Sequence, residues 1–346
     1  MNFWLHILTE SKKMMTSSWK TYAFASVLAL TTVGVLVWRK KKKTYVKVGK
    51  ISKLILYPVK SLKGVEVTHG NCAKKGFEVN GILDRQYMIV TKDHVLLSQT
   101  DAPRLALLTP SIQGNFLLIS GPDVESLKIP IKKSVSSSDK IIECSVIDDV
   151  IKAIDVGDEA ASWFQSFLKI LGVRMVQFHP ELPVRKYTKK DQFFAKLRKE
   201  QPIGFQNLSA LHIVSTASLE DLNSRVDKMK VSEKNFRPSI LVEGCKPFEE
   251  DSWRHIKFGG AEVLFLIPTG RCLSTTNDPE TAVLSQKEPL VTLRKYRIPK
   301  DPALQKKTGS RACFGIHCSV VKPGEVKVGD DIFAVVGEQP DMIKRI

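Results

Sequence analysis

The chain has 346 residues, of which 43% are hydrophobic and 26% charged, so it can form one large or two ordinary domains with real cores, and a wholly disordered chain is excluded. Its 53 Lys and Arg against 36 Asp and Glu give a net charge of +17, which suits an acidic partner, an anionic membrane surface or nucleic acid. No recognition-helix signature, RNA-binding aromatic motif or zinc-ligand spacing accompanies this charge, so nucleic-acid binding is not expected.

The segment from Tyr22 to Trp38 contains no charged residue and, as a helix, spans roughly 25 Å, which predicts a single transmembrane anchor. A buried helix or the apolar part of a signal peptide is the alternative. The basic run from Arg39 to Lys43 follows directly, whereas few lysines precede the span. The excess of positive charge therefore predicts that the C-terminal body faces the cytosol.

Apolar runs separated by turn residues predict a β-rich α+β body after residue 45. We expect strands at 51–59, 87–90, 105–108, 116–120, 240–242, 263–267 and 332–336. Helical spacing predicts one helix over 158–171, ending at Gly172 with its aromatic side chains in the core, and a second beginning at 215–218 and reaching Val226. The basic stretch at 183–202 predicts a linker between two β-rich lobes.

The six cysteines are Cys72, Cys144, Cys245, Cys272, Cys313 and Cys318, and their lack of CxxC spacing, with no ordinary cleavable signal peptide before them, indicates a reducing compartment. Cys272 follows Arg271 at the end of an apolar strand and precedes three hydroxyl residues. A neighbouring guanidinium favours the thiolate, the form that binds a soft metal. The alternative is a small buried thiol beside a surface arginine. For Cys313 and Cys318, buried thiols are expected.

A turn after the first expected strand carries Lys60 and Ser61, and Arg85 lies at the start of the next. A lysine, a hydroxyl and a guanidinium together suit a phosphate, although solvated loop charge is the alternative. Arg237 precedes Pro238, which stiffens the turn before another strand. It is a candidate clamp for an anion or heterocycle, and an ion pair with Glu249 or Glu250 is the alternative.

The order of several motifs resembles that of the MOSC-domain proteins, and within them the mitochondrial amidoxime reducing components. The motifs are YPVKS at 57–61, Asp84 with Arg85, ASLEDLNSR at 217–225, NFRP at 235–238, DSW at 251–253, Arg271 with Cys272, and VGD at 328–330. The resemblance covers about residues 50 to 336. Each motif alone is weak, but the ordered set is specific.

This resemblance implies a two-lobed MOSC-type β-barrel body that binds a molybdenum pterin cofactor. Cys272 matches the metal-ligating cysteine, and Lys60, Ser61 and Arg85 match positions that hold the cofactor's phosphate. Ser209, Arg237, Gly270 and Arg271 match positions around the pterin and metal, and we add Asn207, which stands where relatives commonly carry an aspartate. His317 and Cys318 are expected to be structural. The implied division is an N-terminal segment (1–21), an anchor (22–38), a basic linker (39–49), an N-terminal MOSC-associated domain (50–182), a linker (183–202), a MOSC domain (203–338) and a tail (339–346).

The implied activity is the two-electron reduction of amidoximes, hydroxylamines and related N-hydroxylated compounds. Because no nucleotide-binding GxGxxG motif is present, electrons are expected from a partner, and the resemblance points to cytochrome b5 and its NADH-dependent reductase. The implied location is the outer mitochondrial membrane, with the body in the cytosol. Two alternatives stay open: a sulfur-handling MOSC protein of cofactor maturation, and a membrane-tethered binding module without enzymatic activity.

Overall fold

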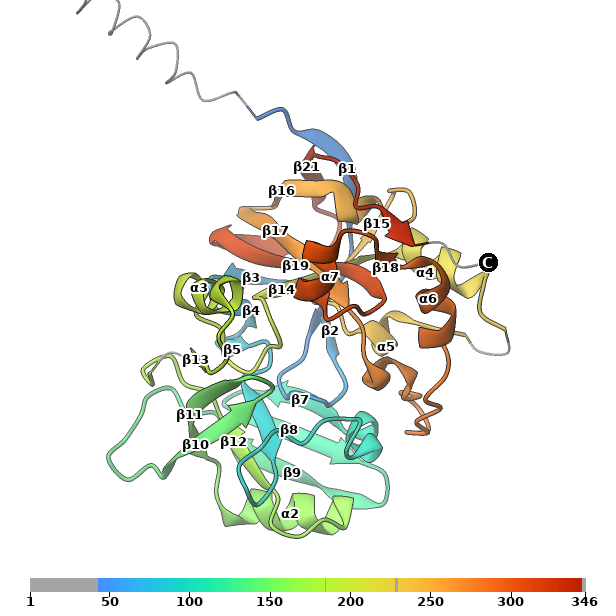
Figure 1. Cartoon of the computed structure of the whole chain (residues 1–346). Coiled ribbons are helices and arrows are strands. Elements are labelled where there is room, and N and C mark those ends of the chain that lie inside the picture. Colours follow the sequence, from blue (N-terminus) through green and yellow to red (C-terminus); the bar gives the residue numbers. More distant parts are fainter. Residues whose placement is uncertain (1–42, 184, 228–229, 344–346) are drawn as a thin grey trace, which may run out of the picture. The chain divides into compact units, whose positions relative to one another are not determined.

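The computed structural model describes residues 43–183, 185–227 and 230–343 (Figure 1). The expected N-terminal segment, the anchor at 22–38 and the first residues of the basic linker lie outside these ranges. Within the described ranges, no helix combines the length and the apolar character needed to cross a membrane.

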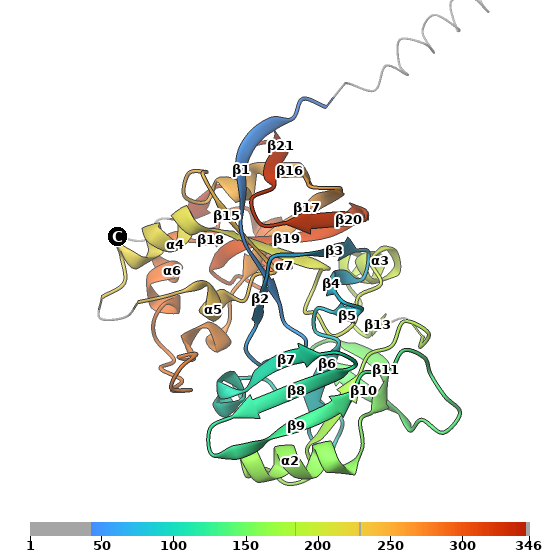
Figure 2. The same ribbon diagram turned by 180° about the vertical axis from the view of Figure 1, so that it is seen from behind.

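A seven-stranded β-barrel forms the larger half of the body (Figures 1 and 2). It closes because β1 pairs with β21 on one side and with β15 on the other, all antiparallel. β14 and β15 are the parallel pair within the barrel. Around it the strands are β15 (Ile240–Glu243), β14 (Leu211–Ser215), β19 (Cys313–Lys322), β17 (Ala261–Gly270), β16 (Trp253–Phe258), β21 (Asp331–Val336) and β1 (Val46–Leu56), with β2 (Val65–Val67) added outside β1.

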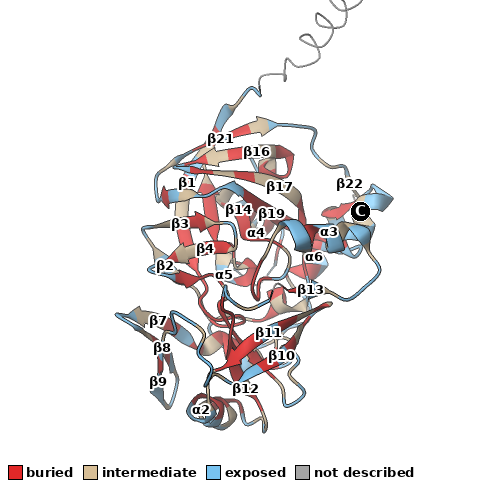
Figure 3. Ribbon diagram, turned by 90° about the vertical axis from the view of Figure 1, so that its left-hand side faces the viewer, coloured by how far each residue is buried: buried red, intermediate tan, exposed pale blue. Residues whose placement is uncertain are grey.

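The barrel interior is filled by apolar side chains from both the first and the last strands of the barrel. Figure 3 colours the residues by burial and shows buried residues along the barrel strands. Val48, Ile51 and Leu54 of β1 lie in the same core as Trp253, which is fully buried. A β-bulge between Lys47 and Gly49 interrupts the pairing of β1 with β21. It lets β1 bend, so that the strand can pair with both β21 and β15. The first strand of the body is therefore a structural part of a barrel whose other strands come from residues 211–336.

A small sheet beside the barrel also joins distant segments. Its order is β20 (Gly324–Lys327), β3 (His69–Ala73), β4 (Gly76–Val79) and β5 (Ile82–Leu83). Phe77 and Val326 belong to the barrel core, so residues 45–83 and 203–343 build one half of the body together.

The second half contains two sheets and one long helix. One sheet has the order β10 (Ile141–Val146), β11 (Asp149–Asp155), β12 (Arg174–Gln177) and β6 (Tyr87–Val90), and β13 (Lys186–Tyr187) pairs with β11. The other is the meander β7 (Thr109–Gln113), β8 (Phe116–Gly121) and β9 (Val124–Pro130). Helix α2 (Asp158–Leu168) buries Phe164 and Phe167 in the core of this half.

Six of the seven expected strands are present, and residues 105–108 are the exception. They belong to the 3-10 helix η1 (Pro103–Leu107), because Pro103 begins a helical turn that buries Leu105 and Ala106. An apolar run of four residues does not distinguish these two conformations. Helix α2 ends before Gly172, because Lys169 adopts the left-handed conformation with φ 59°.

The basic stretch at 183–202 contains regular structure that its composition did not predict. It holds β13 and the helix α3 (Gln192–Glu200), whose N-terminus is capped by the Asp191 carboxylate accepting from two backbone N–H groups. The remaining elements are α4 (Thr216–Asn223), α5 (Glu233–Phe236), η2 (Glu249–Ser252), η3 (Leu273–Thr276), α6 (Leu290–Tyr296), β18 (Ile298–Pro299), α7 (Pro302–Thr308) and β22 (Met342–Ile343).

Candidate active site at the junction of the two halves

Loops from both halves bring most of the expected site residues together. Lys60 follows β1, and its Nζ donates to the Phe205 carbonyl oxygen at 2.8 Å and to Oδ1 of Asn207. Arg85 precedes β6, and its Nη2 donates to the Arg237 carbonyl oxygen at 2.9 Å. Segments near residues 60, 85, 207 and 237, far apart in sequence, are thus connected directly.

Tyr57 lies between two guanidinium groups. The guanidinium carbons of Arg85 and Arg237 each lie 4.3 Å from the centre of its ring, which is a favourable cation–π distance. The Tyr57 backbone N–H donates to Oδ1 of Asp84 at 2.9 Å, and Asp84 also pairs with Arg85. One aromatic ring and one carboxylate therefore hold both arginines in place. In the sequence Tyr57 is only the first residue of the YPVKS motif, and this role was not predicted for it.

Positive charge at this junction exceeds the negative charge that faces it. Burial, together with Arg185, Arg85 and Arg237, holds the pKa of Lys60 well below its usual range, and Asp84 opposes this only in part. Burial and then Arg85 lower the pKa of Arg237 to about 10. Arg185 is paired with Asp149. Such a cluster of buried cations favours the binding of an anion.

Arg237 offers a specific donor to such an anion. Its Nη1 donates to the Leu62 carbonyl oxygen, whereas its Nη2 is buried and has no hydrogen-bond partner among the described residues. Arg237 is the left-handed residue that ends helix α5, with φ 58°. The alternative ion pair does not form, because Glu250 accepts from Ser218 and Glu249 accepts from the Lys246 backbone.

Arg271 lies inside the protein, and Cys272 lies at its surface. The Arg271 guanidinium donates to the carbonyl oxygens of Phe314 and Phe236 and contacts Nε2 of His212. Burial lowers its pKa to about 9. The alternative interpretation of a buried thiol beside a surface arginine is therefore wrong, because the exposures are the reverse.

Cys272 is exposed and held by its own loop. Its carbonyl oxygen accepts from the Thr275 backbone N–H at 3.1 Å and from the Thr275 hydroxyl at 2.8 Å, and its Sγ lies 3.5 Å from Oγ of Ser274. The other five cysteines are buried or half-buried, as expected for Cys313 and Cys318. No group of three or more His, Cys, Asp and Glu that could hold a metal occurs in the described ranges.

The remaining expected residues are Ser209, Ser61 and Gly270. Oγ of Ser209 donates to the Leu211 carbonyl oxygen at 2.8 Å and lies 2.9 Å from Nδ1 of His317. Ser61 is buried with φ 73°. A β-carbon at Gly270 would lie 2.7 Å from the Thr308 carbonyl oxygen, so α7 packs directly against the end of β17.

Two residues that shape the site, His212 and Arg185, could not be recognised from the sequence. His212 bridges the Arg271 guanidinium and the Arg237 carbonyl oxygen, and its pKa lies well below the usual range through burial and then Arg271. An isolated histidine within an apolar strand gave no signal of this role. Arg185 lies in the basic stretch that predicts a linker, but it is buried and donates to the Gly204, Gln206 and Val146 carbonyl oxygens.

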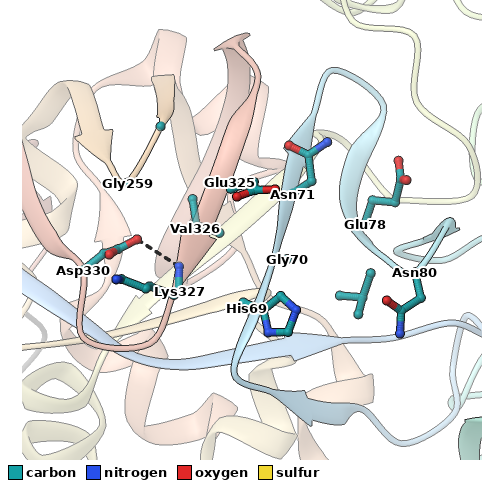
Figure 4. A pocket seen from close by; sticks show the side chains of 12 residues that line it. His69, Gly70, Asn71, Glu78, Asn80, Gly259, Glu325, Val326, Lys327 and Asp330 are labelled. Carbon is teal, nitrogen blue, oxygen red and sulfur yellow. Dashed lines mark hydrogen bonds between the residues drawn. The ribbon is translucent and has the colours of Figure 1, made fainter.

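A separate hollow of about 710 Å³ lies on the barrel between β3, β4 and β20 (Figure 4). Its lining includes His69, Glu78, Glu325 and Asp330, and none of the expected site residues. The cationic cluster and the Cys272 thiol therefore do not line this hollow.

Comparison with known proteins agrees with this arrangement. The model of the MOSC N-terminal beta barrel domain matches residues 48–170, and that of the MOSC domain matches residues 200–333. Mitochondrial amidoxime reducing component 2 of Rattus norvegicus is 37% identical, covering 92% of this chain and 94% of the relative. The Homo sapiens component 2 is 36% identical, covering 89% and 91%. The Homo sapiens component 1 is 35% identical, also covering 89% and 91%.

The YUAD protein from Bacillus subtilis aligns with 84% of this chain and 96% of its own at a TM-score of 0.35 and 11% identity, a likeness too weak for a structural argument. The seven-stranded barrel and the two matching domain models define the class, which is that of the MOSC-domain proteins. Within it, the chain belongs to the mitochondrial amidoxime reducing component family.

Proposed function

We propose that this protein is a molybdenum cofactor-dependent reductase of N-hydroxylated compounds such as amidoximes and hydroxylamines. The names of its relatives and its MOSC domains support a reductase of this kind. The observation that carries the proposal is the exposed Cys272 thiol beside a buried cationic cluster. In that cluster Nη2 of Arg237 has no hydrogen-bond partner among the described residues.

These residues fit a phosphorylated pterin. Lys60, Arg85 and Arg237 would neutralise its phosphate, and Ser61 would contribute a donor. Asn207, Ser209, Gly270 and Arg271 would line the pterin side. Cys272 as a thiolate would be the soft ligand for molybdenum. The buried unpaired donor on Arg237 supports this fit, because such a group costs free energy unless a ligand satisfies it.

In the proposed reaction an amidoxime, two electrons and two protons give an amidine and water. The cofactor, when bound, would supply the two-electron chemistry of this reduction. The protein's own residues would hold the cofactor, keep the Cys272 sulfur directed at it and leave its exposed side open to substrate. We further propose that electrons come from cytochrome b5 and its NADH-dependent reductase, and that the protein is held at the outer mitochondrial membrane by residues 22–38, with its body in the cytosol.

The test is metal analysis and activity of the purified protein beside two cysteine variants. We expect about one molybdenum per chain in the wild type, and loss of both molybdenum and NADH-coupled benzamidoxime reduction in Cys272→Ala. Cys245→Ala is the matched control, because Cys245 is half-buried and its thiol bonds to Ser215, which is not one of the proposed site residues. A wild type without molybdenum, or a Cys272→Ala variant with full activity, would overturn the proposal.

A further inference from the structure

A line of hydroxyl groups reaches the Cys272 sulfur from the other half of the protein. Oγ of Ser274 lies 3.5 Å from Sγ of Cys272, and Oγ1 of Thr100 lies 3.1 Å from the same Ser274 oxygen. Cys272 and Ser274 follow strand β17 of the barrel, whereas Thr100 belongs to the loop that precedes η1 in the second half. Both hydroxyl residues are half-buried.

The direction of these hydrogen bonds follows from the chemistry of the sulfur. In the free protein the Cys272 thiol donates to Oγ of Ser274. As a metal-bound thiolate the sulfur would have no hydrogen and could only accept, so the single Ser274 hydroxyl hydrogen would then be donated to Sγ. The Ser274 oxygen then accepts from the Thr100 hydroxyl. Two hydrogen bonds in one direction polarise each other, and so Thr100 acts on the sulfur through Ser274.

Neighbouring contacts fix both ends of this line. The Thr100 backbone N–H donates to Oγ of Ser98 at 3.2 Å, and that hydroxyl donates to Asp101 at 2.6 Å. On the other side, Nδ2 of Asn277 donates to the Pro103 carbonyl oxygen at 3.1 Å. The loop that carries Cys272 is thus attached to the second half at two points, and the distance between Thr100 and Ser274 does not depend on one contact.

We infer that Ser274 and Thr100 are positioning residues that tune the Cys272 sulfur as a metal ligand, through a hydroxyl relay that crosses from one half of the protein to the other. This inference rests on the proposed function. A hydrogen bond to a ligating thiolate withdraws electron density from it and favours the reduced metal, so the relay raises the reduction potential. It also restricts the orientation of the sulfur.

The experiment is a redox titration of the molybdenum centre, followed by its electron paramagnetic resonance signal, in holoprotein of measured molybdenum content. We expect Ser274→Ala to lower the midpoint potential by on the order of 59 mV for a one-electron step, which is a tenfold change in the equilibrium constant. Ser274→Thr keeps a hydroxyl and should stay near the wild-type value. Thr100→Val should shift the potential in the same direction by a smaller amount, and should add nothing in the Ser274→Ala background.

Thr276→Val is the control in the same loop, because the Thr276 hydroxyl donates to the Leu273 carbonyl oxygen and not to the sulfur. Its potential should equal that of the wild type. Fully loaded Ser274→Ala with an unchanged potential, or a Thr100→Val shift that adds in full to that of Ser274→Ala, would overturn the relay alone. A wild type without molybdenum would overturn the proposed function and this inference with it.

Discussion

At the scale of single residues, Arg237 has a buried Nη2 without a partner in the described structure, so an anion that satisfies it should stabilise the apoprotein. We expect inorganic pyrophosphate, standing in for the cofactor's phosphate, to raise the apoprotein's melting temperature by on the order of a few degrees. Arg237→Met should abolish this rise, because both the charge and the donor are lost. Differential scanning fluorimetry at a series of pyrophosphate concentrations measures the effect.

Arg225→Met is the control for that experiment. Arg225 is an exposed arginine in the turn after α4 that pairs with Asp221 of that helix, so its removal subtracts the same charge without touching the junction. Its melting temperature should still rise with pyrophosphate. An equal loss in both variants would mean that the anion responds to net charge and not to the buried guanidinium.

Which residue types gather at the site was predictable, but their exposure was not. The motifs grouped Lys60, Ser61 and Arg85 around one anion and made Arg237 a separate candidate clamp. The structure brings Lys60, Arg85 and Arg237 together. The sequence order of Arg271 and Cys272 did not reveal that the guanidinium points inward to two carbonyl oxygens while the thiol stays exposed. Those carbonyls belong to residues 236 and 314, and only the tertiary fold brings them to the end of β17.

At the scale of elements, the junction of η2 and α4 holds a buried carboxyl whose ionisation is unfavourable. Glu250 in η2 accepts from the Ser218 hydroxyl at 2.9 Å and from the Ser215 backbone N–H at 3.3 Å, at the start of α4. Burial and then Asp251 raise its pKa from 4.5 to about 7, against the opposing effect of Arg297.

This shift in the pKa of Glu250 makes the free energy of unfolding depend on pH between 4.5 and about 7. The folded protein keeps the Glu250 proton up to about pH 7, whereas the unfolded chain releases it near pH 4.5. The folded state therefore binds more protons in this window, and the contribution of Glu250 to the free energy of unfolding decreases as the pH rises. We expect Glu250→Gln to remove this decrease, which is on the order of 1–3 kcal/mol. Urea unfolding at pH 5 and pH 7.5 measures it.

Glu220→Gln serves as the comparison, since Glu220 is an exposed carboxylate on α4. Its pH dependence should match that of the wild type. If Glu250→Gln instead keeps the full wild-type decrease between pH 5 and pH 7.5, the decrease has another origin.

Elements with clear periodicity were predictable from the sequence, and short or charged ones were not. Helix α2 and six strands follow their apolar patterns closely. The run at 105–108 is too short for its period to separate a strand from a turn of helix, and η1 was missed for that reason. Helix α3 is stabilised by its Asp191 cap and by a few half-buried aromatic side chains, features that a high density of lysines obscured.

At the scale of the whole body, β1 determines whether the barrel can exist. It lies between β21 and β15, and both would become open edges without it. The barrel core would also lose Val48, Ile51 and Leu54, together with the contributions of β3 and β4. The sequence alone could not show that β1 closes the barrel. The apolar pattern at 51–59 predicts a strand, but it does not indicate which strand, some 190 residues further along the chain, pairs with it.

We therefore expect that residues 203–343 do not fold when produced alone. This fragment contains all but the first few residues of the match to the MOSC domain. Two exposed sheet edges and an opened core leave too little burial to offset the conformational entropy of the chain. Urea titration followed by circular dichroism should show a cooperative transition for residues 45–343 and none for residues 203–343. Co-production with residues 45–183 should restore the transition, because it returns β1 and the strands that follow it. A cooperative transition in the short fragment alone would mean that β15 and β21 can close a barrel without β1, and that the contribution of the first strand lies only in carrying Tyr57 and Lys60 to the site.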